Sequence, residues 1–177
     1  MINQKTFPSW SCMISRGATT VWERWDNIRT NGSFNNPVMN SFNHYGLGSV
    51  GDWMYRTIGG IEPDPQHPGY RRFAVRPRPG GGLTSANAAY DSPYGQICSS
   101  WKAGDGELAV NATVPVNTTA LVYVPAASRA DVTAPSGARF VRMEGPAAGP
   151  AAGPAAGRAA VYAVGSGSYA FTARGAT

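Results

Sequence analysis

The chain has 177 residues, of which 42% are hydrophobic and 11% aromatic, so it is long and apolar enough to bury a core and is not a disordered tail. Its net charge is +5, but only 14% of its residues are charged and the basic ones form no continuous run, which argues against a nucleic-acid partner. No segment approaches the roughly 20 apolar residues of a membrane span, so we expect no membrane partner either.

The first ten residues, MINQKTFPSW, lack the apolar core of about 7 to 15 residues that a secretory signal contains, so the sequence leaves the compartment undetermined. The two cysteines, Cys12 and Cys98, form no CxxC pair and lie in segments that we expect to fold separately. We therefore expect two buried free thiols, with no disulfide and no metal site. No spacing in the sequence implies a cofactor.

The composition of the chain changes near residue 62, and the part before it favours helices. Apolar residues recur at helical spacing from Val38 to Ile58, which predicts a helix that Asn40 or Ser41 caps and that Gly59 and Gly60 end. The glycines inside this range disfavour a helix by about 1 kcal/mol each relative to alanine, which indicates close packing or a site that needs room. A second, shorter helix is predicted to start near Thr19 or Thr20.

The part after residue 62 favours β-strands. A proline-rich connector comes first, and eight short alternating runs follow at about ten-residue spacing, which is typical of an antiparallel β-sandwich or barrel. We therefore predict an α+β chain with a helical domain at 1–62, a linker at 63–70 and a β-sandwich at 71–177. The predicted strands are 71–77, 83–93, 94–103, 106–115, 118–125, 138–143, 158–164 and 167–173.

Two further segments receive no function. Gly145 to Arg158 repeats the tetrapeptide GPAA between two strand-like runs, and we expect an expanded hairpin loop there. Gly165 to Tyr169, GSGSY, matches the GxSxG pattern of a nucleophile elbow. It lies in a predicted hairpin turn and not at a strand-to-helix bend, so we do not assign it to catalysis.

The strongest candidate for chemistry is Glu23, which the sequence VWERWD places between Trp22 and Trp25. A carboxylate beside indole rings suits proton transfer near neutral pH, and flat aromatic faces stack on sugar rings. The alternative interpretation is structural: the tryptophans belong to the core, and Glu23 pairs with Arg24 or Arg29. His44, among Asn, Ser and Tyr residues, is either a donor to a hydroxylated ligand or a histidine that caps a helix.

Five segments in this order resemble the C-terminal end of the bacterial α-L-rhamnosidases of glycoside hydrolase family 78. The resemblance extends from about Phe7 to Phe171, and the joint order and spacing make it specific. The segments are FPSW, ISRGATTVWERWD, MNSFNHYGLGSVGDWMYRTIGGI, PGYRRFAVRPRPGGGLTSANAAYDSPYG and VPVNTTALVYVP.

The resemblance implies the last helices of an (α/α)6-barrel catalytic domain followed by a C-terminal β-sandwich. It implies an inverting hydrolase that removes terminal α-L-rhamnose from glycosides, so a rhamnose-containing glycoside is the expected partner. Glu23 corresponds to the general base, and Trp22 or Trp25, together with His44, would line the rhamnose subsite.

The family places its general acid on earlier helices, upstream of the segment that this sequence resembles. We therefore expect the chain to be a C-terminal fragment that carries the base and part of the pocket, lacks the acid and is inactive alone. Its expected protein partner is the missing N-terminal part of the barrel. Two alternatives stay open, namely a non-catalytic accessory or carbohydrate-binding β-sandwich and an inactive truncated gene product.

Overall fold

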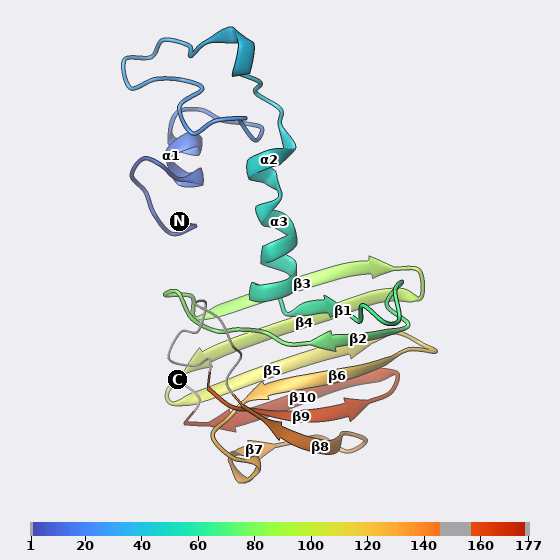
Figure 1. The fold of residues 1–177 in the computed structure, drawn as a ribbon. Helices are drawn as coiled ribbons and strands as arrows, with labels where there is room; N and C mark the ends of the chain where they lie inside the picture. The colour runs from blue at the N-terminus through green and yellow to red at the C-terminus, as the bar shows by residue number, and fades with distance from the viewer. Residues whose placement is uncertain (1, 146–156, 176–177) are drawn as a thin grey trace. The chain divides into compact units, whose positions relative to one another are not determined.

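The computed structural model describes residues 2–145 and 157–175. The chain forms two compact units, Met1–Asp52 and Trp53–Thr177 (Figure 1). The hairpin loop predicted for the GPAA repeats falls on residues 146–156, which lie outside the described residues.

The first unit consists of short helices joined by irregular segments. Ser9 begins the first helix, where its hydroxyl oxygen accepts a hydrogen bond from the main-chain N–H of Cys12 at 3.1 Å. The helical segments of this unit are α1 (Trp10–Ser15), the 3₁₀ turn η1 (Pro37–Met39), α2 (Tyr45–Gly48) and α3 (Val50–Trp53), which ends at the boundary of the unit. The π-helical turn η2 (Met54–Ile58) follows and belongs to the second unit.

The helix predicted to start near Thr19 or Thr20 is wrong, because the chain is not helical there. The Thr20 hydroxyl donates to the carbonyl of Phe42, and the Val21 carbonyl accepts from the N–H of His44, so these residues bond to another segment. β-Branched residues and hydroxyl side chains that bond to the main chain both disfavour a helix.

The helix predicted from Val38 is right only in its second half. Helical structure resumes at Tyr45, and the capping residue is His44 and not Asn40 or Ser41. Ser41 instead uses its main chain to bond outside the helix. The predicted end is confirmed, since η2 closes at Gly59 and Gly60 follows with φ of 78°. A Cβ atom at Gly60 would lie 2.2 Å from the Pro77 nitrogen, so only glycine fits there.

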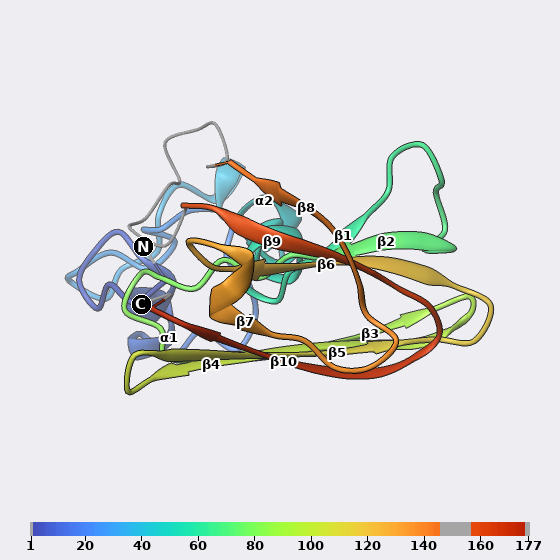
Figure 2. The same ribbon diagram turned by 90° about the horizontal axis from the view of Figure 1, so that it is seen from below.

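The second unit is a sandwich of two five-stranded sheets (Figure 2). One sheet has the order β1-β2-β6-β9-β8, with strands β1 (Ile61–Pro63), β2 (Arg72–Val75), β6 (Thr119–Pro125), β9 (Ala159–Val164) and β8 (Arg139–Glu144). The other has the order β3-β4-β5-β10-β7, with strands β3 (Ser85–Ser92), β4 (Gly95–Gly104), β5 (Glu107–Val114), β10 (Gly167–Arg174) and β7 (Val132–Thr133). A 3₁₀ turn, η3 (Arg129–Asp131), precedes β7.

All eight predicted strands are confirmed, and the sandwich with them. The sheet that contains β3 is antiparallel throughout, whereas the other is mixed because β2 pairs with β6 in parallel. Only Gly165 and Ser166 of the segment GSGSY lie in the predicted turn between β9 and β10, whereas Gly167–Tyr169 already belong to β10. The sequence patterns missed β1 and β7, which have only three and two residues. The domain limits at 62 and 70 stay a prediction, to which the structure adds that Ile61–Pro63 already pairs with β2.

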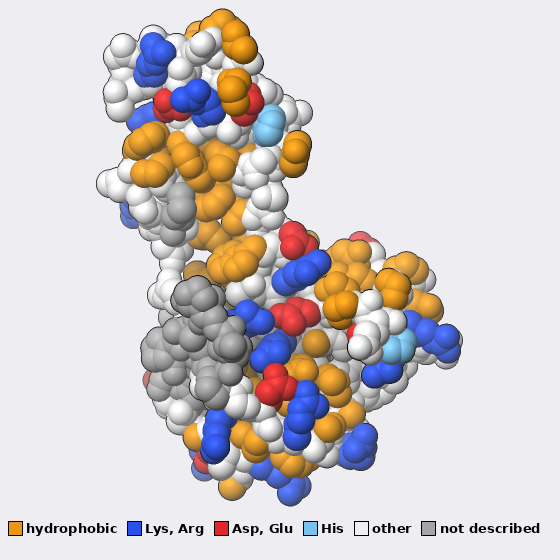
Figure 3. Space-filling view, viewed as in Figure 1, with side chains coloured by type: hydrophobic (Ala, Val, Ile, Leu, Met, Phe, Trp, Pro, Cys, Tyr) orange, Lys and Arg blue, Asp and Glu red, His pale blue; other side chains and the backbone are white. Residues whose placement is uncertain are grey.

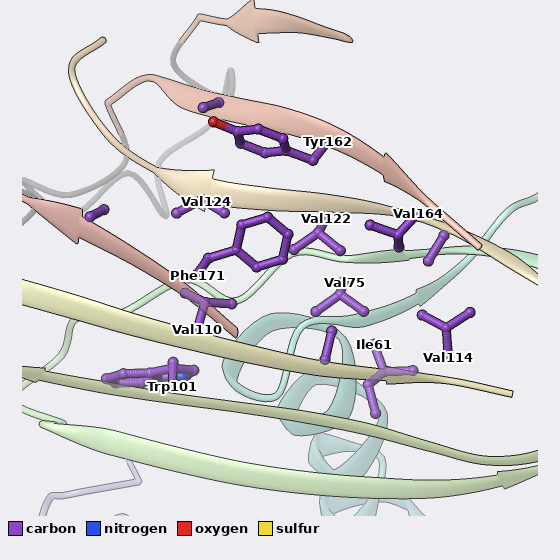
Figure 4. Packing of buried hydrophobic residues seen from close by; sticks show 14 of the residues in the cluster. Ile61, Val75, Trp101, Val110, Val114, Val122, Val124, Tyr162, Val164 and Phe171 are labelled. Carbon is purple, nitrogen blue, oxygen red and sulfur yellow. The ribbon is translucent and has the colours of Figure 1, made fainter. Parts of the chain in front are cut away.

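The core of the sandwich lies between the two sheets. Burial alternates along β5, where Leu108, Val110, Ala112 and Val114 are buried while Glu107 and Asn111 are exposed. Figure 4 shows Val122 and Val124 from one sheet meeting Phe171 and Val110 from the other. Apolar burial of this kind is the main stabilising contribution to a sandwich.

Charged side chains of both signs lie side by side on the outer surface of the sandwich (Figure 3). Glu144 binds Arg76 at 2.9 Å and Arg142 at 2.6 Å, and the Arg142 side chain donates to the Tyr123 hydroxyl at 3.4 Å. The hydrogen bond to Glu144 is the main reason that the pKa of Arg142 is raised. Arg76 and Arg142 are therefore both paired with Glu144.

Candidate active site

Two segments that are distant in sequence lie side by side in the first unit and carry the candidate residues. The N–H of Glu23 donates to the Ser41 carbonyl at 2.9 Å, and the N–H of His44 donates to the Val21 carbonyl at 2.9 Å. These main-chain bonds bring the loop 21–27 against the segment 41–44, and so bring Glu23 and His44 together. Sequence reasoning proposed both residues but did not predict this pairing.

The Glu23 carboxylate has one oxygen bound and one oxygen turned toward His44. Its Oε2 accepts a hydrogen bond from the main-chain N–H of Ser41 at 2.9 Å. Its Oε1 lies 3.9 Å from the Nε2 atom of His44, and the side chain is 17% exposed. A separation of 3.9 Å is too long for a direct hydrogen bond, but a hydroxyl group of a ligand can contact both atoms.

His44 begins helix α2 and faces Glu23 at the same time. Its Nδ1 accepts a hydrogen bond from the N–H of Gly46 at 3.0 Å, which leaves the proton of a neutral ring on Nε2, the atom nearest Glu23. A Cβ atom at Gly46 would lie 3.0 Å from Nδ1, so a glycine lets the main chain approach the ring. The exposed ring of Tyr45 stacks on the ring of His44 with centroids 5.0 Å apart. The structure confirms His44 as the cap of a helix, and its role as a donor to a hydroxylated ligand stays a prediction.

The two tryptophans beside Glu23 differ in their surroundings. Trp22 is only 2% exposed, and its ring meets that of Phe42 edge-on at 5.5 Å. Trp25 is half-buried and meets the ring of Trp10 edge-on at 4.9 Å. Trp25 is therefore the one with surface left for a ligand.

The charged neighbours of Glu23 are engaged elsewhere. Arg24 pairs with Asp26 at 3.0 Å, and Arg29 donates to the side-chain oxygen of Asn35 at 3.1 Å. The structural interpretation, in which Glu23 pairs with one of these arginines, does not match the contacts that Glu23 makes with Ser41 and His44.

Sequence reasoning missed two contributors, Ser41 and Asn27. Ser41 contributes through its main-chain groups, which nearly every residue type has, so the sequence does not single it out. Asn27 is fully buried and donates from its side chain to the Ser41 carbonyl at 2.6 Å. The only signal in the sequence is its position directly after VWERWD, and nothing in that position indicates burial.

The described residues also bear on cofactors, thiols and membranes. Within residues 2–145 and 157–175, no group of three or more His, Cys, Asp or Glu side chains is arranged to hold a metal ion. Cys12 is buried as predicted and Cys98 is only half-buried, and both are free thiols. None of the helices in this part of the chain has the length and apolarity to cross a membrane.

Comparison with known proteins places both units in one family. Residues 1–58 match the model of the bacterial alpha-L-rhamnosidase 6 hairpin glycosidase domain, and residues 60–139 match that of the bacterial alpha-L-rhamnosidase C-terminal domain. An α-L-rhamnosidase of Streptomyces avermitilis is 45% identical over 172 residues. The chain belongs to the bacterial α-L-rhamnosidase family. It corresponds to the end of the six-hairpin domain and to the C-terminal domain, as the sequence resemblance predicted.

Two further comparisons support this placement within the rhamnosidases. The crystal structure of the Streptomyces avermitilis α-L-rhamnosidase complexed with L-rhamnose matches 98% of this chain with a TM-score of 0.82 and 44% identity. The Aspergillus terreus enzyme also matches over 98% of the chain, with a TM-score of 0.74 and 33% identity. The chain spans only 15% of the length of the Streptomyces avermitilis relative.

Proposed function

We propose that the chain supplies the general base and part of the rhamnose pocket of an inverting α-L-rhamnosidase, which removes terminal α-L-rhamnose from glycosides. The observation that carries this proposal is the state of Glu23. Its carboxylate is largely shielded from solvent, is held by the Ser41 N–H through Oε2 and presents Oε1 toward His44. This arrangement occurs in a chain that is 45% identical to an α-L-rhamnosidase.

In this mechanism Glu23 activates the attacking water. Its Oε1 accepts a proton while the water oxygen attacks the anomeric carbon from the face opposite to the leaving group. A second carboxyl group, about 6.5–9.5 Å away, protonates the departing glycosidic oxygen. The anomeric configuration inverts because attack and departure take place on opposite faces.

We assign the sugar contacts to His44 and Trp25. The Nε2–H of His44 can donate to a sugar hydroxyl beside Glu23, and half-buried Trp25 has ring surface for the apolar side of the sugar. Trp22, which the sequence proposes for the same role, has its ring buried, so we assign to it the packing of the loop that carries Glu23. The related enzyme from Streptomyces avermitilis binds L-rhamnose in its crystal structure.

The general acid and the rest of the pocket come, in this proposal, from the part of a six-hairpin domain that the chain does not span. The first unit exposes large apolar side chains that such helices can cover, namely Phe7, Ile14, Phe34, Val38, Met39 and Tyr45. The protein partner is therefore the remainder of that domain.

The test is a hybrid enzyme in which this chain replaces the matching segment of the Streptomyces avermitilis α-L-rhamnosidase. Hydrolysis of a chromogenic α-L-rhamnoside is measured for the hybrid, for its Glu23→Gln variant and for the 177-residue chain alone. We expect Glu23→Gln to lower kcat about 10²- to 10⁴-fold, because general base catalysis is lost while the side chain keeps its shape. We expect no turnover from the chain alone.

A matched control separates this effect from a general loss of charge. Glu62→Gln removes a carboxylate that binds Arg78 at 3.1 Å in the sandwich, and it should leave kcat unchanged. Full turnover in the Glu23→Gln hybrid would remove Glu23 from the mechanism. Turnover by the chain alone that is lost in Glu23→Gln would show that this chain, or a second copy of it, provides the second carboxylate.

The β-sandwich has a structural role in this proposal and does not bind sugar. Its tryptophan and two further aromatic side chains are used in packing, since Trp101, Tyr162 and Phe171 are each no more than 3% exposed. The Trp101 Nε1–H also donates to the Ile58 carbonyl at 2.8 Å, which ties β4 to the end of η2. A rhamnose titration of the chain that shifted NMR signals of the sandwich would favour the carbohydrate-binding alternative.

A further inference from the structure

The loop of Glu23 contains one fully buried polar side chain, that of Asn27. A buried amide is stable only when its donors and acceptors are bonded. The Asn27 Oδ1 accepts from the main-chain N–H of Arg24 at 2.9 Å, which closes the turn between these residues. Its Nδ2 donates to the carbonyl of Ser41 at 2.6 Å, which reaches across to the other segment.

The main chain of Ser41 stands between Asn27 and Glu23, with its carbonyl and its N–H in two successive peptide units. Its carbonyl accepts two hydrogen bonds, from the side chain of Asn27 and from the N–H of Glu23, so both lone pairs are used and its orientation is set. Its own N–H donates to Oε2 of the Glu23 carboxylate at 2.9 Å. A hydrogen bond to an ionised carboxylate is stronger than one between neutral groups.

We propose that Asn27 is a positioning residue for Glu23. Through Ser41 it holds Oε2 against a main-chain N–H, so that Oε1 is the oxygen left to take a proton beside His44. This inference rests on the proposed function for the role of the carboxylate. The hydrogen bonds that carry it are testable without any activity.

Two substitutions separate the two bonds of Asn27. Asn27→Asp keeps the acceptor for Arg24 and nearly the same shape, but it loses the donor toward Ser41. Asn27→Ala loses both bonds. If Asn27 only closes its own turn, Asn27→Asp leaves the contact between Ser41 and Glu23 as it is in the wild type, whatever the buried carboxylate costs in stability. If Asn27 positions Glu23 through Ser41, both variants weaken the hydrogen bond between the Ser41 N–H and the Glu23 carboxylate.

The first measurement uses NMR on the full 177-residue chain. The chemical shift of the Ser41 amide proton should change as Glu23 ionises, and Glu23→Gln should abolish this change. We expect Asn27→Asp and Asn27→Ala to lose most of it. A matched control is Asn36→Ala, which removes another asparagine that accepts from a main-chain N–H, that of Val38 at 3.0 Å, on an exposed turn. In Asn36→Ala the Ser41 amide signal should change with pH as it does in the wild type.

A retained change of the Ser41 chemical shift in folded Asn27→Asp would overturn the proposal. A second observable needs no variant: scalar coupling across the hydrogen bond from the Asn27 side-chain nitrogen to the Ser41 carbonyl carbon. Its detection in the wild-type chain supports the bridge, and its absence overturns it even if the variants fail to fold.

The second measurement is kinetic and uses the hybrid enzyme. We expect Asn27→Asp to lower kcat about 10- to 100-fold with KM changed less than about two-fold, because misplacing a catalytic group affects the transition state more than substrate binding. Equal losses in Asn27→Asp and Asn36→Ala would reduce Asn27 to a structural role. Full turnover in Glu23→Gln, with the Ser41 signal still dependent on Asn27, would reject the proposed function and keep the bridge.

Discussion

The two units of the chain differ in the interactions that stabilise each of them internally. In the sandwich, the buried residues are overwhelmingly apolar, and they come from regular strands of both sheets. In the first unit, the buried apolar residues Cys12, Met13 and Trp22 lie beside two buried polar ones, Ser9 and Asn27. Both polar side chains hydrogen-bond to main-chain atoms, Ser9 at the start of helix α1 and Asn27 in irregular segments.

This difference matches the tasks that the units have in the proposed enzyme. Apolar burial is strong but has no direction, so it stabilises a structural domain without fixing the position of a particular oxygen atom. Hydrogen bonds are directional, and a network of them can hold a carboxylate within a fraction of an ångström. The unit with the smaller apolar core is the one that carries Glu23 and His44.

The largest expected effect comes from truncating one phenylalanine in each unit and comparing the losses in the free energy of unfolding. Phe171 is 1% exposed in the core of the sandwich, and Phe34 is 68% exposed in the first unit. We expect Phe171→Ala to lower the free energy of unfolding by about 3–5 kcal/mol and Phe34→Ala by less than about 0.5 kcal/mol. Chemical denaturation of the two variants measures both values. Similar losses would show that the first unit is stabilised by apolar contacts as much as the sandwich is.

The same contrast explains how much of the fold the sequence could predict. Strands such as β5 alternate apolar and polar residues, because one face of each sheet is buried, so the pattern is visible without a structure. The strand β1 was hidden in the proline-rich connector, since three residues are too few for a pattern. The helix predicted to start near Thr19 or Thr20 is absent because Thr20 and Val21 hydrogen-bond to Phe42 and His44, residues far along the chain that a local pattern does not reveal.

The candidate site was predictable in part, for a related reason. Glu23 and His44 have side chains whose chemistry suggests a role wherever they lie, and the family resemblance identified their segments. Ser41 contributes a main-chain N–H, and Asn27 contributes a buried amide, so neither contact can be predicted from the type of the residue. Only the pairing of the two segments in the fold reveals them.

A smaller effect is expected at a turn of the sandwich, where it tests whether the turn requires a glycine. The hairpin between β4 and β5 turns at Asp105 and Gly106, which have φ of 54° and 75°. We expect Gly106→Ala to destabilise the chain by about 1–2 kcal/mol, because a Cβ atom disfavours this left-handed conformation. Gly104→Ala is the control, since this neighbouring glycine has ordinary φ and open space around it. Thermal unfolding that is equal in both variants would show that the turn does not need its glycine.

The smallest effect concerns a charge at the edge of the sandwich and its dependence on pH. A hydrogen bond from the main-chain N–H of Gln66 lowers the pKa of Asp64 below 3.8, and contacts with His67 and Arg72 lower it further. Because the pKa is lower in the folded than in the unfolded chain, the stabilisation is complete above pH 3.8 and is lost as the pH falls through the folded value. Asp64→Asn should therefore be slightly less stable than the wild type at neutral pH, and the difference should vanish in acid, once the pH is below the folded-state pKa. Denaturation curves at neutral and at acid pH measure it. A difference that persists in acid would mean that Asp64 acts through its shape and not through its charge, and that polar contacts in the sandwich do not share the directional role that they have around Glu23.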